Sequence, residues 1–206
     1  MYLPKNTQIN NKLFAQDLIR EKPLGLLFSN LKRRVEINSY PFISQEINDD
    51  LYLFTHISKS NRQWQTLTGE VVICFQGPQY YISPTIYKNL FNVPTWNYVA
   101  LQVFGRAQLI TEAKPLSYLL EESVLIFESA NQTDWTYELP EKMKQQLERA
   151  IVGVKIKVDR LELKCKLSQN AGASDYSDVH EFFKHNETEQ GKEMYKWMLK
   201  VEGCDD

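Results

Sequence analysis

A nine-residue run from His56 to Trp64 holds the side chains of this chain that are best suited to bind an anionic group. Its sequence is H-I-S-K-S-N-R-Q-W, and it lies between a predicted strand and a predicted short helix. Such a turn before a helix favours the binding of phosphate, because lysine and arginine form charge-assisted hydrogen bonds with it and hydroxyl and backbone groups add further donors. An ordinary polar turn between a strand and a helix is the alternative explanation. The candidates for holding the phosphate are Lys59 and Arg62 together with Ser58 and Ser60, and His56 and Asn61 are further candidates for cofactor binding in the same run.

A second stretch, F-Q-G-P-Q-Y-Y-I-S-P over residues 75–84, has the residue types that suit a flat ligand. A glycine lets the backbone approach a ring closely, and aromatic side chains line its edge. A structural turn with aromatic core neighbours explains the same composition equally well. The candidates for contact with such a ring are Gln76 and Gly77 in this stretch and Trp96 beyond it.

The sequence offers little for catalysis or metal binding. Signature motifs such as H-E-x-x-H, the P-loop, G-x-S-x-G and G-x-G-x-x-G are absent, and no pair of side chains is placed for proton transfer. Three sparse cysteines form neither a disulfide framework nor a zinc site. We therefore expect no catalytic residues and no metal, and leave open whether the protein is an enzyme.

Several features predict a cytoplasmic protein without a membrane span. The cysteines are few and odd in number, which is typical of a reducing compartment. The start of the chain lacks the apolar stretch of a signal peptide, and the longest clean apolar run is about five residues, far below the roughly 18 that a span needs.

Charge is distributed unevenly along the chain, and one window is almost without it. Residues 71–105 contain one charged side chain, Lys88, and eight of the 25 aromatic residues. A solvated surface carries charge at ordinary density, so this segment is buried in the core, in a subunit interface or against a flat ligand. The tyrosine, tryptophan and amide side chains in it have polar ends that need partners, which favours an interface in addition to core.

The alternation of apolar residues predicts a mostly antiparallel sheet with helices at the start, middle and end. Strands are expected at 24–29, 35–41, 51–56, 70–76, 80–83, 96–110 and 151–163, with Gly77-Pro78 breaking the fourth. Helices are expected at 10–22, 60–66 with Ser60 as cap, 83–90, 111–129, 140–148, 174–184 and 188–201. The fold class is therefore α+β, with the sheet closed as a barrel.

The balance of charge argues against tight binding to nucleic acid. The formal net charge is −2, and residues 171–206 carry nine acidic residues against four lysines. Strong sequence-independent binding to DNA requires many cations on phosphates, and no helix-turn-helix with a basic recognition helix is present. Direct DNA binding is therefore doubtful.

Five segments together resemble the PaiB-type negative transcriptional regulators. They are the run 56–64, the stretch 75–84, V-P-T-W-N-Y-V-A-L-Q-V-F-G-R-A over 93–107, A-I-V-G at 150–153 and K-L-S-Q-N at 166–170. The resemblance implies an FMN-binding split β-barrel of the pyridoxamine-phosphate-oxidase-like superfamily. It also implies a homodimer with flavin sites between subunits. The barrel domain would span residues 1–170, with 171–206 as an acidic helical extension packed on it.

If FMN is bound, we expect its phosphate near Ser58, Lys59 and Arg62, because this is the compact cluster of cations and hydroxyls directly after a strand. We expect its ring near Gln76, Gly77 and Trp96 of one subunit or its mate, because these residues offer close backbone, an aromatic face and an amide edge. The chain departs from the family pattern at Ser39, where histidine is common, and at Ala171, where arginine is common.

Three functions follow as hypotheses. The first is a dimeric flavoprotein acting as a regulator or sensor. The second is a flavin-dependent oxidoreductase, and the third is a divergent barrel without cofactor that works through protein contacts.

Overall fold

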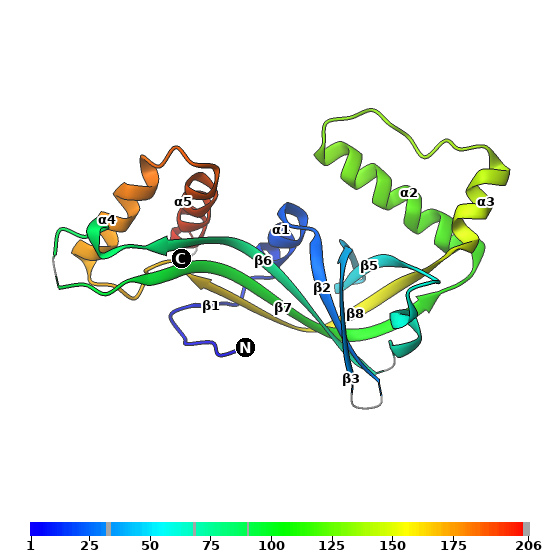
Figure 1. Ribbon diagram of the computed structural model, residues 1–206, viewed down its shortest axis with the longest axis horizontal. Coiled ribbons are helices and arrows are strands. Elements are labelled where there is room, and N and C mark those ends of the chain that lie inside the picture. The colour runs from blue at the N-terminus through cyan, green and yellow to red at the C-terminus, as the bar shows by residue number, and fades with distance from the viewer. Residues whose placement is uncertain (32–33, 68, 90, 204–206) are drawn as a thin grey trace. The chain divides into compact units, whose positions relative to one another are not determined.

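The computed structural model describes residues 1–31, 34–67, 69–89 and 91–203 (Figure 1). The strands are β1 (Gln8–Ile9), β2 (Leu24–Leu31), β3 (Arg34–Pro41), β4 (Ile43–Ile47), β5 (Asp50–Ser58), β6 (Glu70–Ile82), β7 (Thr95–Ile110) and β8 (Ile151–Lys166). The α-helices are α1 (Lys12–Glu21), α2 (Ala113–Ala130), α3 (Glu141–Arg149), α4 (Ala173–Lys184) and α5 (Glu189–Glu202). Two short 3-10 helices are η1 (Arg62–Thr66) and η2 (Pro84–Ile86).

The described strands form one sheet with the order β3-β2-β6-β7-β8-β5-β4, and β1 pairs with β8. The pairs β1–β8, β2–β3, β2–β6, β4–β5 and β5–β8 are antiparallel. An α+β fold with an antiparallel sheet is therefore confirmed. The strand order is an open path from β3 to β4, so closure into a barrel stays a prediction.

The chain divides into two compact units, and each contains parts that are distant in sequence. One comprises residues 13–75 and 102–161, here called the large unit, and the other comprises residues 1–12, 76–101 and 162–206, here called the small unit. The predicted division at residue 170 stays a prediction.

The large unit has its core between the sheet and the helices α1 and α2. Fully buried side chains from α1 and from strands β2, β5, β6, β7 and β8 fill it, among them Leu18, Leu27, Leu53, Ile73, Val103 and Ile156. Helix α2 packs onto β8 at Gly153, where an added Cβ would lie 3.0 Å from Leu119 and 3.1 Å from Leu116. In the last strand the predicted buried positions Val152, Val154 and Ile156 are confirmed, whereas Val158 is only half-buried.

The small unit is built around α4 and α5, which lie side by side in Figure 1 (orange and red). Tyr80 of β6 meets the rings of Phe182 and Phe183 with centroids 5.8 and 5.0 Å away. The backbone amide of Lys88 donates to Asp178 at 2.9 Å, and its ammonium lies 3.0 Å from the same carboxylate. These two interactions hold the pKa of Asp178 below its ordinary value and tie the segment after η2 to α4.

The predicted break at Gly77-Pro78 is wrong, because β6 continues from Glu70 to Ile82. Strand β2 pairs with β6 only up to Cys74. The residues of β6 beyond Cys74 do not pair with β2, so the absence of a backbone N–H at Pro78 breaks no hydrogen bond to β2.

Strand β4 was not predicted from the sequence, and a tight turn follows it. Asn48 and Asp49 both have positive φ, 52° and 67°, which is typical of a two-residue hairpin turn. The pair closes β4 onto β5, with Ile47 opposite Asp50. Strand β1 was also not predicted, since its two residues carry no periodicity.

The two short helices are smaller than the sequence indicated. Asn61, and not Ser60, caps η1 by accepting a bond from the amide of Gln63 at 3.1 Å. Of the helical turn predicted over 83–90, residues 84–86 form η2 with Ser83 as its cap, and residue 90 lies outside the described residues. Thr188 caps α5 by accepting a bond from the amide of Gly191 at 3.1 Å, whereas α4 begins after Gly172 without a side-chain cap.

Gly105 lies on β7 at a point where the backbone of the neighbouring strand β8 comes close. A Cβ at this position would be 2.3 Å from the carbonyl oxygen of Lys157. We expect Gly105→Ala to lower the free energy of unfolding by about 1 to 3 kcal/mol, because backbone must move to admit the methyl group. Urea unfolding measures the change. Gly172→Ala is the control, since nothing lies within 4 Å of a Cβ there, and equal stability of the two variants would contradict the prediction.

Candidate functional site

The predicted phosphate-binding run begins at the end of β5, where the large unit exposes it to solvent. Ser58, Lys59 and Ser60 are exposed, and the hydroxyls of the two serines lie 2.7 Å apart. The ammonium of Lys59 donates to the carbonyl oxygen of Arg149 at 2.7 Å, and its backbone amide donates to that of Ala150 at 2.8 Å. A lysine ammonium has three donors, so two remain for a ligand.

The register between β5 and β8 explains why the end of α3 meets this run. Ser58 lies opposite Ile151, the first residue of β8, so the last residues of α3 arrive beside Lys59. Arg149 is therefore a candidate that the sequence did not indicate. Its only signal was its position directly before a predicted strand, and the partner of that strand could not be known from the sequence.

Asn61 and Arg62 differ in what they can offer a ligand. Asn61 uses its oxygen to cap η1 and donates from its amide to the hydroxyl of Tyr40 at 2.9 Å. Its role is thus largely structural. Arg62 is exposed at the start of η1, so its guanidinium is accessible to an anion.

Gln63 is fully buried and connects η1 to β2 and β3. Its carbonyl oxygen accepts from Asn38 and Tyr40, both at 2.8 Å. Its amide nitrogen lies 2.9 Å from the carbonyl oxygen of Leu27, and it also contacts the hydroxyl of Ser29 and the carbonyl oxygen of Glu36. This network fixes the turn that carries Asn61 and Arg62, and no local pattern in the sequence marks Gln63 as its centre.

His56 lies on β5 opposite Gly153 and is half-buried. Burial lowers its pKa below the ordinary value of 6.5, because desolvation disfavours the imidazolium. The imidazole is therefore neutral at pH 7 and offers a hydrogen bond to a ligand, not a charge.

The predicted ring-contacting residues lie in the small unit. Gln76 is exposed on β6, whereas Gly77 is buried beside it. Trp96 on β7 is 53% exposed and meets Tyr81 edge-on, with ring centroids 5.7 Å apart. The aromatic surface that these two rings form is accessible to a flat ligand. The two groups of candidates thus belong to different units.

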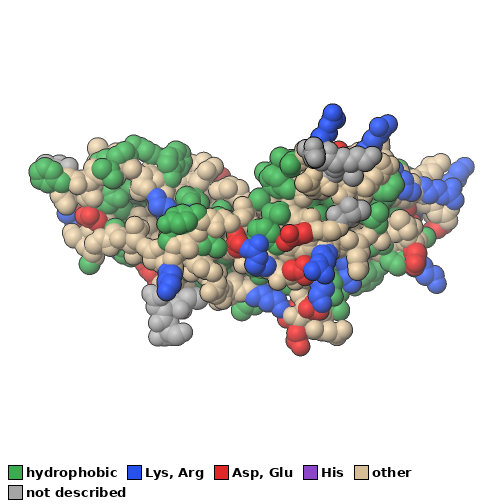
Figure 2. All heavy atoms as spheres, turned by 90° about the horizontal axis from the view of Figure 1, so that it is seen from below, with side chains coloured by type: hydrophobic (Ala, Val, Ile, Leu, Met, Phe, Trp, Pro, Cys, Tyr) green, Lys and Arg blue, Asp and Glu red, His purple; other side chains and the backbone are tan. Residues whose placement is uncertain are grey.

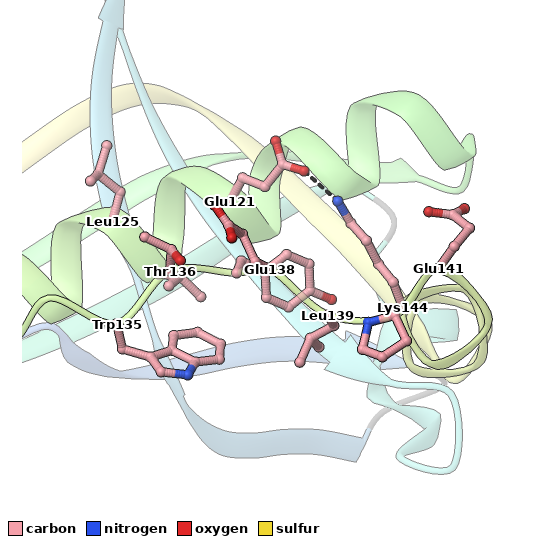
Figure 3. A pocket seen from close by; sticks show the side chains of 11 residues that line it. Glu121, Leu125, Trp135, Thr136, Glu138, Leu139, Glu141 and Lys144 are labelled. Atoms are coloured by element: carbon pink, nitrogen blue, oxygen red, sulfur yellow. Dashed lines mark hydrogen bonds and ion pairs between the residues drawn. The ribbon is translucent and has the colours of Figure 1, made fainter.

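Two cavities in the large unit border α3. The first, of about 780 Å³, is lined by α2, α3 and the segment between them (Figure 3). Trp135 and Tyr137 meet there with centroids 6.3 Å apart, and Lys144 forms an ion pair with Glu121. The second, of about 440 Å³, contains Lys59 together with Lys114, Lys144 and Arg149. The donors in this second cavity are of the kind that binds phosphate, so the residues present fit a phosphorylated cofactor.

The described residues contain no group of three or more histidine, cysteine or acidic side chains able to hold a metal ion. Burial raises the pKa of Cys165 to about 12, so its thiol is protonated at neutral pH. Within the described part of the chain, no helix is long and apolar enough to cross a membrane.

Comparison with known sequences reveals a family. The family model described as "Putative FMN-binding domain" matches residues 1–160. The protein "Protease synthase and sporulation protein PAI 2" of Bacillus subtilis is 30% identical over 205 residues, which cover 96% of each chain. An uncharacterised protein of Aspergillus fumigatus is 29% identical over 88% of this chain and 90% of its own.

Comparison with solved structures shows the same fold in proteins of low sequence identity. The flavocytochrome Anf3 of Azotobacter vinelandii matches with a TM-score of 0.58 and 13% identity, over 77% of this chain and 69% of its own. The FAD and heme binding protein of Mycobacterium smegmatis matches with a TM-score of 0.58 and 15% identity, over 84% and 78%.

Loss of the Gln63 side chain should destabilise the fold. Gln63→Ala leaves Asn38, Tyr40 and the carbonyl of Leu27 without their partner, and each buried unpaired group costs about 1 to 3 kcal/mol. We expect unfolding in urea to show a loss of at least about 3 kcal/mol. Gln65→Ala, at an exposed position of the same short helix, should change stability by less than about 0.5 kcal/mol. A small effect at Gln63 would show that the network is dispensable.

Proposed function

Because this chain belongs to the family of the putative FMN-binding domain, we propose that it is a homodimeric flavin-binding split-barrel protein with a regulatory role. The match over residues 1–160 carries the proposal, and the relative PAI 2 supports it. It agrees with the resemblance to PaiB-type regulators that the sequence motifs indicated. The cofactor is FMN or a related flavin, and bound FMN supplies a flat redox-active ring.

The run at the end of β5 is proposed to hold the phosphate of the flavin. Lys59 retains two donors beside its bond to Arg149, and Arg62 is exposed at the start of η1. Ser58 adds a hydroxyl, and His56 adds a neutral imidazole. A phosphate dianion is neutralised by two such cations, while the hydroxyl orients it.

The isoalloxazine ring is proposed to lie against Gln76, Gly77 and Trp96 of the same subunit or its mate. Trp96 and Tyr81 present aromatic surface, and Gln76 presents an exposed amide that suits the polar edge of the ring.

The homodimer is supported by the apolar surface that the charge-poor window exposes. Phe91 is 96% exposed and Val93 is 76% exposed, and Tyr81 and Trp96 are half exposed in the same unit. Apolar side chains at this density favour burial against a second copy. A shared interface is also where the resemblance places the flavin.

A regulatory role through direct contact with DNA receives no support from the charges. The net charge is −2. On the face that Figure 2 shows, lysine and arginine side chains are interspersed with acidic ones and form no continuous basic surface. We therefore place regulation in flavin binding and protein contacts.

Removal of the Lys59 side chain should weaken the binding of FMN. Because one charge-assisted phosphate contact contributes about 1.5 to 3 kcal/mol, Lys59→Ala should raise the Kd for FMN roughly ten- to a hundredfold in a fluorescence titration. Lys142→Ala, which changes an exposed lysine of α3, should leave it unchanged. Equal affinities of the two variants would exclude Lys59 from the site. Failure of the unmodified protein to bind any flavin would favour the cofactor-free hypothesis, which the departures at Ser39 and Ala171 keep open.

The dimer has a direct test in solution. Light scattering at micromolar concentration should give about twice the chain mass of 24.2 kDa. Phe91→Asp and Val93→Asp together should shift the mass toward that of the monomer, because a charged side chain is costly to bury in an interface. A monomeric mass for the unmodified protein would remove the shared-site proposal.

A further inference from the structure

The cavity of about 440 Å³ beside Lys59 lies where the end of β5, the start of α2 and the helix α3 meet. Ser117 and Thr111 add hydroxyls to its wall, and Gln145 adds an amide. Four cations and two carboxylates line it: Lys59, Lys114, Lys144 and Arg149 against Glu141 and Glu148. The cavity is thus positively charged in a chain whose net charge is negative.

Two of these cations are engaged within the fold. Lys144 pairs with Glu121, as the dashed line in Figure 3 marks. The ammonium of Lys59 uses one of its three donors for the carbonyl oxygen of Arg149. By contrast, the side chains of Lys114 and Arg149 are exposed and make no ion pair with any described residue. Their charges are available for an anion.

The carboxylate of Glu148 adds a different requirement. Its Oε1 is buried and has no hydrogen-bond partner among the described residues. The carboxylate of Glu141, in contrast, accepts from Gln145 at 2.7 Å. A buried acceptor without a donor is costly and calls for a donor from outside the chain. Glu148 lines the cavity and its side chain is part-exposed, so its carboxylate offers an acceptor there.

We propose that this cavity binds a phosphorylated polyol, with its phosphate on Lys59, Lys114 and Arg149 and a hydroxyl donating to Glu148. Cationic side chains that make no ion pair favour binding of a phosphate. A carboxylate without a hydrogen-bond partner favours a hydroxyl donor next to that phosphate. A phosphate ester of a hydroxylated chain carries both groups a few bonds apart. The ribityl phosphate of FMN and a free sugar phosphate share this chemistry.

In the case of FMN the inference rests on the proposed function. Lys59 is common to both phosphate positions, but His56, Ser58 and Arg62 do not line the cavity. The inference therefore places the phosphate on Lys114 and Arg149 in place of Arg62, and these residues and Glu148 are ones that the sequence motifs do not include. Helix α2 begins at the cavity, where Ala113 lines the wall, and no side chain caps its first turn. The positive end of the helix dipole therefore adds to the positive charge of the cavity.

The test compares Lys114→Ala and Arg149→Ala with Lys142→Ala, a lysine of α3 that does not line the cavity. The first two variants should raise the Kd for FMN about ten- to a hundredfold in a fluorescence titration, and the control should not. Affinity for riboflavin, which lacks the phosphate, should stay equal in all four proteins. Unchanged FMN affinity in the first two variants would overturn the inference. A loss of riboflavin affinity as large as the loss of FMN affinity would also overturn it.

Ribose 5-phosphate distinguishes the two sources of the phosphate. If it competes with FMN in the unmodified protein, the cavity holds the flavin phosphate. If it binds in calorimetry with the same dependence on Lys114 and Arg149 while no flavin binds, the inference stands and the proposed function fails. If neither FMN nor ribose 5-phosphate binds, the inference is wrong.

Glu148→Ala tests the hydroxyl contact. It should weaken ribose 5-phosphate about tenfold, because the acceptor is lost. Inorganic phosphate should bind equally well or more tightly, because a negative charge is removed from the cavity. A merely structural role of Glu148 would weaken both probes alike and would overturn this contact.

Discussion

The geometry of the phosphate-binding run depends on the hydrogen bonds of the buried Gln63 side chain. Its amide oxygen accepts from Asn38 and Tyr40 of β3, and its amide nitrogen donates to the carbonyl oxygen of Leu27 in β2. Tyr40 in turn accepts from Asn61, the cap of η1. The turn after β5 is therefore fixed from within the large unit, so its exposed cations can be oriented without bonding to one another. A ligand then meets preorganised donors, which lowers the entropy lost on binding.

The second constraint is the pairing of β5 with β8. Because the strands are antiparallel, the last residue of β5 lies opposite the first residue of β8, and the helix before β8 ends beside Lys59. This contact joins two regions about 90 residues apart and creates the positive cavity from lysines and arginine that are scattered in the sequence. Electrostatic attraction for a phosphate is thus a product of strand register, and no local motif carries it.

The small unit relies on its acidic helix in a comparable way. Asp178 binds both the backbone amide and the ammonium of Lys88, and Asp175 accepts from Asn92. These bonds hold the segment between η2 and β7 to α4. The acidic residues of the C-terminal part therefore do not all form a solvated surface. At least these two position the segment that contains Phe91 and Val93, whose apolar side chains are exposed.

The sequence by itself determined the α+β class, most strands and helices and the family, because alternation and compact motifs are local properties. For the same reason it predicted the run from His56 to Arg62 as a site for phosphate. It could not supply β4, the continuity of β6 past Pro78, or the roles of Gln63, Lys114, Arg149 and Glu148. Those depend on which strand pairs with which and on where a helix ends in space. A glutamine or a lysine has the same local signal in a solvated helix as in a buried network or a charged cavity, so only the tertiary structure decided between them.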